Sequence, residues 1–142
     1  MLYLNILIVF CSILSLSDIF RRKLPNLALI LLGVFQLSML NITNIHITTF
    51  LLVLSIGFVL FYFDCIGGGD VKYAAVLSLA LPLTRLPEAL SYTAYAGGML
   101  IIAYYILYFF SETKKIQHMK LPYGVAISVG FYLAIFDHHS SI

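Results

Sequence analysis

Six long apolar runs dominate this chain and limit what it can fold into. Hydrophobic residues make up 62% of its 142 residues and charged residues only 10%, against about 25% charged in a typical soluble domain. A water-soluble globule of this length has too little interior to bury so much apolar surface. A membrane-spanning helix needs roughly 20 apolar residues. The sequence therefore predicts an all-α integral membrane protein, a bundle of six transmembrane helices. The predicted spans are residues 2–17, 24–40, 45–63, 71–86, 89–110 and 121–136.

Short polar segments separate the runs, and none is long enough to hold a second domain. The breaks read SDIFRRKLPN, NITNIH, DCIGGGD, TRLPE and SETKKIQHMK, and no internal repeat is visible. We expect a single integral membrane domain at residues 1–142. Residues 1–17 have no basic residue ahead of the apolar run and no small-x-small cleavage site. We therefore expect a retained first span and not a removable signal.

The basic residues predict the orientation in the membrane. The formal net charge of +2 is too small to suggest a nucleic acid partner. With six spans, the first, third and fifth connections share one side, and the other side holds only Arg85. Because cytoplasmic loops carry an excess of Lys and Arg, we expect these three connections in the cytoplasm and both termini outside. The basic residues on the cytoplasmic side are Arg21, Arg22, Lys23, Lys72, Lys114, Lys115 and Lys120.

The cysteines and histidines give no reason to expect a metal or another cofactor. Cys11 and Cys65 each lie in or beside an apolar run, as buried free thiols do. His138 and His139 are adjacent in the last residues of the sequence. A solvated tail accounts for them better than a metal site does.

The segment FDCIGGGDVKYA, residues 63–74, interrupts the apolar pattern with two carboxylates, three glycines and a lysine. We expect Gly67, Gly68 and Gly69 to break the helix just before Asp70. Glycine lets one backbone approach another closely. Non-helical backbone at membrane depth survives only where protein or a water-filled cavity satisfies its polar groups. The glycines can therefore serve a tight turn or the approach of a peptide substrate.

Two aspartates mark the ends of two predicted spans. Asp18 ends the first span and Asp70 starts the fourth. The chain crosses the membrane twice between them, so both should lie at the same face. Carboxylates at a membrane edge usually face a cavity or a partner. A close pair tends to keep one proton, so one member can take a proton from water while the other donates to a carbonyl oxygen.

Three motifs in this chain resemble the type IV prepilin leader peptidases, which are GxGD-type membrane aspartic proteases. The residues 67–72, GGGDVK, are similar to the family's G-x-G-D-x-K. Asp18 precedes an Arg-Arg pair and then Pro25 and Asn26, as in the family. The residues 121–124, LPYG, are similar to the start of the family's last span, with Pro122 and Gly124 in place. Each motif falls at the cytoplasmic end of a predicted span.

The resemblance implies a specific activity. Asp18 and Asp70 would be the catalytic pair, acting through water without a metal or cofactor. The substrate would be a prepilin, cut just after a glycine on the cytoplasmic side of the bacterial inner membrane. The chain has no CxxC motif and no connection long enough for the extra region of the larger enzymes. It is therefore similar to the short Tad/Flp-pilus type, and peptidase activity without N-methylation is expected.

Other motif residues carry weaker expectations. We expect Gly67, Gly68, Gly69, Lys72, Pro25, Asn26, Pro122 and Gly124 to shape the site or to bind substrate. Asp64 stands where the family more often has a small residue, commonly glycine. A solvated loop acid is the simplest interpretation of Asp64, and a contact with the catalytic pair or the substrate is the alternative.

Three other functions fit parts of the pattern. A small ion or proton transporter also uses paired membrane carboxylates beside a broken helix. However, it predicts acids near the bilayer midplane and an inverted repeat, whereas these acids lie at span ends. A structural subunit of a secretion machine explains the spans but not the three motifs. A presenilin-type protease shares GxGD but places its other aspartate in a different context.

Overall fold

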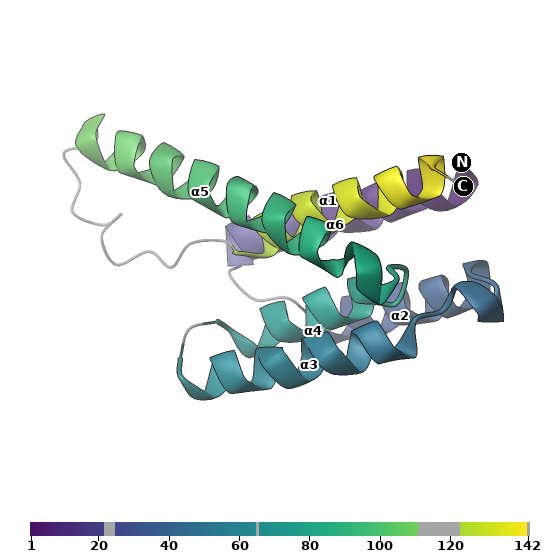
Figure 1. Ribbon diagram of the computed structural model, residues 1–142. Helices are drawn as coiled ribbons and strands as arrows, with labels where there is room; N and C mark the ends of the chain where they lie inside the picture. The colour runs from purple at the N-terminus through teal and green to yellow at the C-terminus, as the bar shows by residue number, and fades with distance from the viewer. Residues whose placement is uncertain (22–24, 65, 111–122, 142) are drawn as a thin grey trace.

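The computed structural model describes residues 1–21, 25–64, 66–110 and 123–141 (Figure 1). Within these ranges the chain forms six α-helices and two short 3₁₀ helices, and no strand. The predicted all-α architecture is therefore confirmed. The elements are α1 (Leu2–Arg21), α2 (Asn26–Met39), η1 (Ile42–Asn44), α3 (Ile47–Tyr62), α4 (Gly68–Ser78), η2 (Leu83–Arg85), α5 (Leu86–Phe110) and α6 (Tyr123–Ser140).

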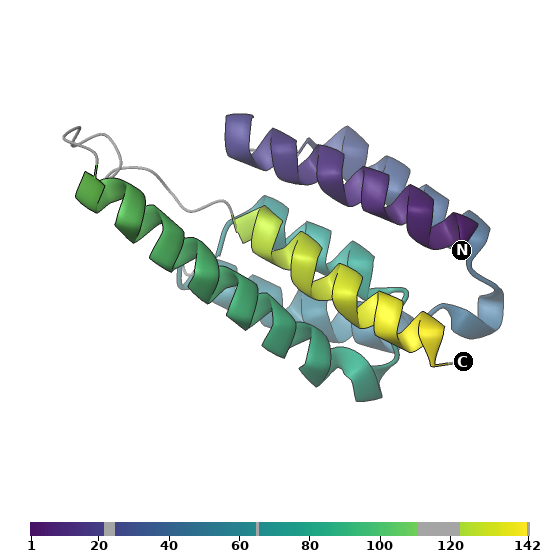
Figure 2. The ribbon, with the colours of Figure 1, turned by 90° about the horizontal axis from the view of Figure 1, so that it is seen from above.

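The helices form two layers that meet at α4 and α6. One layer holds α1, α5 and α6, and the other holds α2, α3 and α4 (Figure 1). Seen from above, α6 lies between α1 and α5 (Figure 2), and it packs against both of them and against α4. In the other layer, α4 packs against α2 and α3. Both termini lie at one end of the bundle (Figure 1). The C-terminal end of α1 and the N-terminal ends of α4 and α6 therefore lie at the opposite end.

Two glycines allow the closest helix contacts within these layers. A Cβ at Gly130 of α6 would lie 2.5 Å from the backbone nitrogen of Thr93 in α5. A Cβ at Gly57 of α3 would lie 3.1 Å from Cγ2 of Val71 in α4. The first distance is shorter than a Cβ can adopt and the second is tight, so a side chain at either position would force its helix or the facing residue to shift. Small residues at such contacts are typical of helix packing in membranes.

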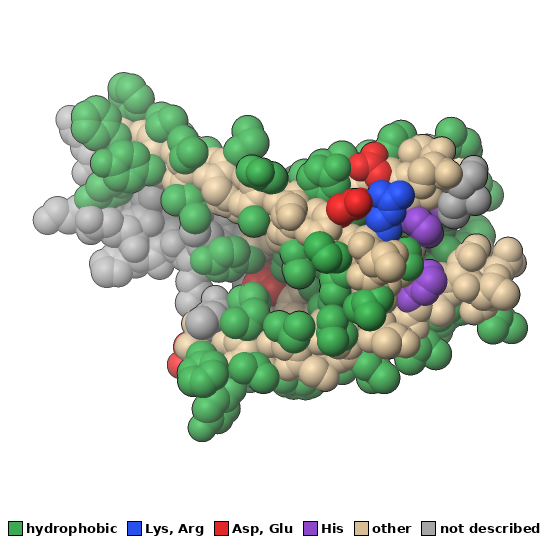
Figure 3. All heavy atoms as spheres, viewed as in Figure 1, with side chains coloured by type: hydrophobic (Ala, Val, Ile, Leu, Met, Phe, Trp, Pro, Cys, Tyr) green, Lys and Arg blue, Asp and Glu red, His purple; other side chains and the backbone are tan. Residues whose placement is uncertain are grey.

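The outer surface is apolar, as a lipid-facing surface should be. Three stretches in the described residues are long and apolar enough to cross a membrane: 2–21, 42–62 and 83–110. In α5, only Leu86 and Ala89 are buried, so most of its apolar side chains point away from the bundle. Hydrophobic side chains are also spread over both layers of the face seen in Figure 3. The chain is therefore an all-α membrane protein.

The fourth predicted span differs most from the structure. The apolar pattern predicts residues 71–86, but α4 ends at Ser78 and has 11 residues. At 1.5 Å per residue, α4 is only about 17 Å long, which is less than the roughly 30 Å of a bilayer core. The chain then continues through a buried, non-helical segment, in which Leu81 is fully buried. The backbone N–H of His46 donates to the carbonyl of Leu79 over 2.9 Å, which satisfies one polar group of this segment inside the protein.

The glycine segment also differs in detail from the prediction. Gly67 has extended backbone (φ −71°, ψ 148°) and stands directly before α4, whereas Gly68 begins the helix. The break therefore precedes Gly68, and Asp70 lies in the first turn of α4. Among the described residues, no glycine has a positive φ. The residue that does is Asp64, at φ 58°, just after the end of α3.

Candidate active site

Asp18 lies in the last turn of α1, where its carboxylate meets the start of α6. Only 7% of its surface is exposed. The backbone N–H of Gly124 donates to Asp18 Oδ2 over 2.8 Å. Because α6 begins at Tyr123, this N–H belongs to the first turn, whose N–H groups have no acceptor within the helix. The carboxylate of Asp18 supplies that acceptor.

Gly124 is glycine because the carboxylate of Asp18 occupies the space of a side chain. A Cβ at this position would lie 2.7 Å from Asp18 Oδ2 and 3.0 Å from its Cγ. Neither distance is tolerable for a carbon atom. The glycine of the LPYG motif therefore lets the start of α6 approach Asp18 closely enough to form the hydrogen bond.

Asp70 lies at the same end of the bundle, in the first turn of α4, and is half-buried. A negative charge is favourable there because the N-terminal end of a helix carries partial positive charge. The carboxylate lies close to Gly67, since a Cβ on that residue would be 3.3 Å from Asp70 Oδ2. Asp70 is also close enough to Asp18 for the two charges to interact. The fold thus brings together two carboxylates that are far apart in the sequence.

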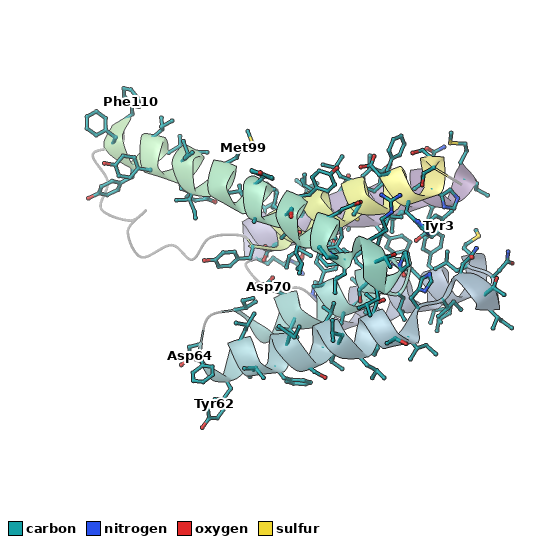
Figure 4. The ribbon with its side chains drawn as sticks, viewed as in Figure 1. Tyr3, Tyr62, Asp64, Asp70, Met99 and Phe110 are labelled. Carbon is teal, nitrogen blue, oxygen red and sulfur yellow. The ribbon has the colours of Figure 1, made fainter. Side chains whose placement is uncertain are left out.

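An apolar cavity of about 150 Å³ opens beside Asp70. Asp70 is the one ionisable group among the described residues that line it. Figure 4 places Asp70 where α4 faces the α5 and α6 layer, and Figure 3 shows an acidic side chain within a recess between the two layers. The lining residues are Val53, Ile56, Gly57, Leu60, Ile66, Asp70, Val71, Ala74, Leu86, Leu90, Thr93, Ile127 and Phe131.

Lys72 and Asn26 lie together, but away from the cavity beside Asp70. Both line a separate, larger cavity of about 500 Å³ between α2, α3 and α4. Residues two apart on a helix do not face the same way, so Lys72 points away from the side of α4 that carries Asp70. Pro25 is exposed at the start of α2. Pro122, like Arg22, Lys23, Cys65 and the lysines of residues 111–122, lies outside the described residues.

Asp64 is exposed and lies apart from Asp70 at the outer edge of the bundle (Figure 4). Its positive φ of 58° belongs to the left-handed region that glycine adopts readily and that aspartate tolerates better than most residues. Backbone conformation therefore accounts for the glycine that the family more often has here. The exposure agrees with the simpler interpretation, a solvated loop acid.

The sequence analysis missed three buried or half-buried hydroxyls beneath the aspartates. Tyr73 and Ser128 are buried, Ser15 is half-buried, and the three hydroxyls meet. Each lies one helical turn from a motif residue in its own helix. A polar residue at that spacing within an apolar run is a signal that the sequence does contain. Which hydroxyls meet depends on the packing of three helices, and that is not visible in the sequence.

One of three comparisons with known proteins gave a match. The model of the type IV leader peptidase family matches residues 5–102, a segment that includes Asp18 and Asp70 and more than half of the chain. Neither the search of curated proteins nor the search of solved structures gave a match. The family match identifies a peptidase of the leader-peptidase kind. The chain therefore belongs to the type IV leader peptidase family.

Proposed function

We propose that this chain is a membrane aspartic endopeptidase that removes the leader peptide of Flp-like type IV prepilins, with Asp18 and Asp70 as its catalytic pair. The observation that carries the proposal is that these two carboxylates lie at the same end of the bundle, near enough for each charge to influence the other. The family match supports a leader peptidase. The aspartic mechanism rests on the pair itself.

The chemistry needs one proton shared between two carboxylates. The ionised carboxylate takes a proton from water, and the water oxygen attacks the carbonyl carbon of the scissile peptide bond. The protonated carboxyl gives its proton to the carbonyl oxygen, and a tetrahedral intermediate forms. Collapse of the intermediate, with a proton passing to the leaving nitrogen, breaks the C–N bond. The pair titrates as a unit, so the two roles belong to the dyad as a whole.

The apolar cavity beside Asp70 supports a hydrophobic substrate. Its described lining is apolar apart from Asp70 and the hydroxyl of Thr93. An apolar side chain next to the scissile bond would fit this surface and would exclude water from it. The substrate's own apolar helix would then lie in the bilayer beside the enzyme, with its leader near the aspartates.

The distribution of charge supports an active site at the cytoplasmic face. Arg21 lies in the last turn of α1, next to Asp18. Toward the other end of the bundle, Arg85 pairs with Glu88 at 2.8 Å. The basic residues that adjoin the aspartates in the sequence support a cytoplasmic location for the end of the bundle that holds the aspartates, because cytoplasmic segments carry an excess of Lys and Arg. We therefore propose a multi-pass protein of the bacterial inner membrane.

The test is cleavage of a prepilin that is co-expressed with the full chain in bacterial membranes. We expect wild-type protein to shorten a Flp-like prepilin by its leader, with a new N-terminus directly after a glycine and without an added methyl group. Mass spectrometry of the product measures both properties. A prepilin panel that remains uncut by wild-type protein present at normal membrane levels would contradict the proposal.

A further inference from the structure

A cluster of three hydroxyls lies one helical turn beneath the aspartates. Ser128 in α6 is its centre. Ser15 Oγ donates to Ser128 Oγ over 2.9 Å, and Tyr73 Oη lies 2.5 Å from the same oxygen. Ser128 Oγ donates in turn to the carbonyl oxygen of Gly124 over 2.7 Å. We call Ser15, Tyr73 and Ser128 the hydroxyl cluster.

Counting protons gives each bond its direction. The carbonyl of Gly124 can only accept, so the single proton of Ser128 is used there. The two lone pairs of Ser128 Oγ are then left to accept from Ser15 and from Tyr73, so Tyr73 must be the donor in its bond. Ser128 thus makes all three of the hydrogen bonds that a hydroxyl can make. Its exposed fraction is 4% and that of Tyr73 is 0%, so water does not replace these bonds.

The cluster joins the three helices that carry the site. Ser15 precedes Asp18 by three residues in α1, and Tyr73 follows Asp70 by three residues in α4. Ser128 follows Gly124 by four residues in α6. Residues three or four apart share one face of a helix. Each helix that contributes to the site therefore also contributes one hydroxyl, one turn deeper in the bundle.

We infer that Ser128 is a positioning residue for the proposed peptidase reaction: it holds the first turn of α6 so that the N–H of Gly124 stays bonded to Asp18, and it ties that turn to α4, which carries Asp70. Ser128 itself does not touch the reacting atoms. The inference rests on the proposed function for its effect on catalysis. Its structural part, the hold on the first turn of α6, can be measured without any substrate.

The experiment compares Ser128→Ala with wild-type protein, using the full chain in lipid nanodiscs. Because a small misplacement of a catalytic group costs up to about a hundredfold in rate, we expect kcat to fall about ten- to a hundredfold. We expect KM to change by less than about threefold, since substrate binding is not what the hydroxyl supports. Amide hydrogen exchange at Gly124 should become faster. Ser128→Thr, which keeps the hydroxyl, should restore most of the lost kcat.

The matched control is Ser12→Ala. Ser12 is exposed in the same helix as Ser15, and its hydroxyl bonds only within that helix, to the carbonyl of Ile8 at 2.7 Å. The Ser12→Ala variant should leave both kcat and amide exchange at Gly124 unchanged. If Ser128→Ala does not accumulate in membranes, Tyr73→Phe and Ser15→Ala each remove one bond of the cluster while keeping most of the side chain. They should show the same effects to a smaller degree.

Several results would overturn the inference. A Ser128→Ala variant with an unchanged kcat and unchanged amide exchange at Gly124 would do so. So would a rise in KM alone, which would assign Ser128 to substrate binding, or a loss of kcat with unchanged exchange at Gly124. If wild-type protein cleaves no prepilin, the proposed function fails, but exchange at Gly124 still decides the structural part. Faster exchange in Ser128→Ala then supports it, and unchanged exchange overturns it.

Discussion

The backbone N–H of Gly124 donates a 2.8 Å hydrogen bond to Oδ2 of Asp18, which joins residues that are 106 positions apart in the chain. The carboxylate of Asp18 is thus held by the N-terminal end of α6, a helix that follows Asp70 in the sequence. The partial positive charge of that helix end favours a carboxylate at this place. The position of Asp18 therefore depends on α6 as well as on its own helix.

Substitution of Gly124 by alanine should disable the site without unfolding the protein. The new Cβ would lie 2.7 Å from Asp18 Oδ2, so either the carboxylate or the first turn of α6 must move. Alanine also favours a helix over glycine by about 1 kcal/mol, which offsets part of the strain. We expect prepilin cleavage to fall by about a hundredfold, with near-normal amounts of protein in the membrane.

The matched control for this change is Gly98→Ala in α5. A Cβ at Gly98 would have nothing within 4 Å, so this variant should cleave at the wild-type rate. Equal activity of Gly124→Ala and wild-type protein would show that the contact with Asp18 does not matter for the reaction.

The close contact between Gly57 and Val71 should couple the effects of substitutions at these two positions of α3 and α4. Gly57→Ala places a Cβ 3.1 Å from Val71 Cγ2, and overpacking of this kind costs about 1–3 kcal/mol in free energy of unfolding. Val71→Ala removes the two methyl groups that would lie nearest to the new Cβ. We therefore expect the double variant to be more stable than the sum of the two single effects predicts, as measured by thermal unfolding in detergent.

Gly33→Ala is the control for that series. Its Cβ would lie 3.9 Å from Val76 Cγ1, an ordinary contact, so it should unfold at the wild-type temperature or slightly above. If the effects of Gly57→Ala and Val71→Ala on stability are strictly additive, the two residues are not coupled through this contact.

Asp64 should matter for the backbone and not for catalysis. Its φ of 58° suits glycine, whereas alanine in the left-handed region costs about 1–2 kcal/mol per residue. We expect Asp64→Ala to unfold at a lower temperature than Asp64→Gly. All variants at this exposed position should cleave prepilin at the wild-type rate. A large loss of cleavage in Asp64→Gly would instead give this carboxylate a part in the site.

The rate of cleavage should depend on pH in a bell shape. A working pair holds one proton, so activity should fall at low pH, where both carboxylates are protonated, and at high pH, where both are ionised. The profile of kcat/KM with a fixed prepilin in nanodiscs measures both limbs. A rate that stays level from acidic to alkaline pH would be inconsistent with a shared proton.

The sequence predicted the helical class and the end of the bundle at which the two aspartates lie, because both depend on the pattern of apolar runs. Long apolar runs indicate membrane helices, and the count of spans places Asp18 and Asp70 at one end of the bundle. The separation of Lys72 from Asp70 was also open to prediction. It follows from helical geometry once α4 is known to begin at Gly68.

The end of α4 was open to prediction as well. Pro82 has no N–H to donate to the carbonyl of Ser78, and its ring clashes with that carbonyl. The predicted span 71–86 ran through this proline, whereas α4 ends at Ser78.

The meeting of the three hydroxyls could not be predicted in this way. Ser128 lies one turn from the motif residue Gly124, but the sequence does not show which side chains its hydroxyl contacts, and Ser12 bonds only within its own helix. Only the packing of α1, α4 and α6 brings the hydroxyl of Ser128 to those of Ser15 and Tyr73.

The most direct test of the account is cleavage of one Flp-like prepilin by Asp18→Asn, Asp70→Asn and Asp64→Asn beside wild-type protein, at equal membrane levels. Asparagine keeps the size of the side chain but removes the proton chemistry of the carboxyl. The account predicts that both dyad variants lose cleavage, whereas Asp64→Asn retains it. Cleavage that persists without the carboxylate of Asp18 or of Asp70 would contradict the proposed mechanism.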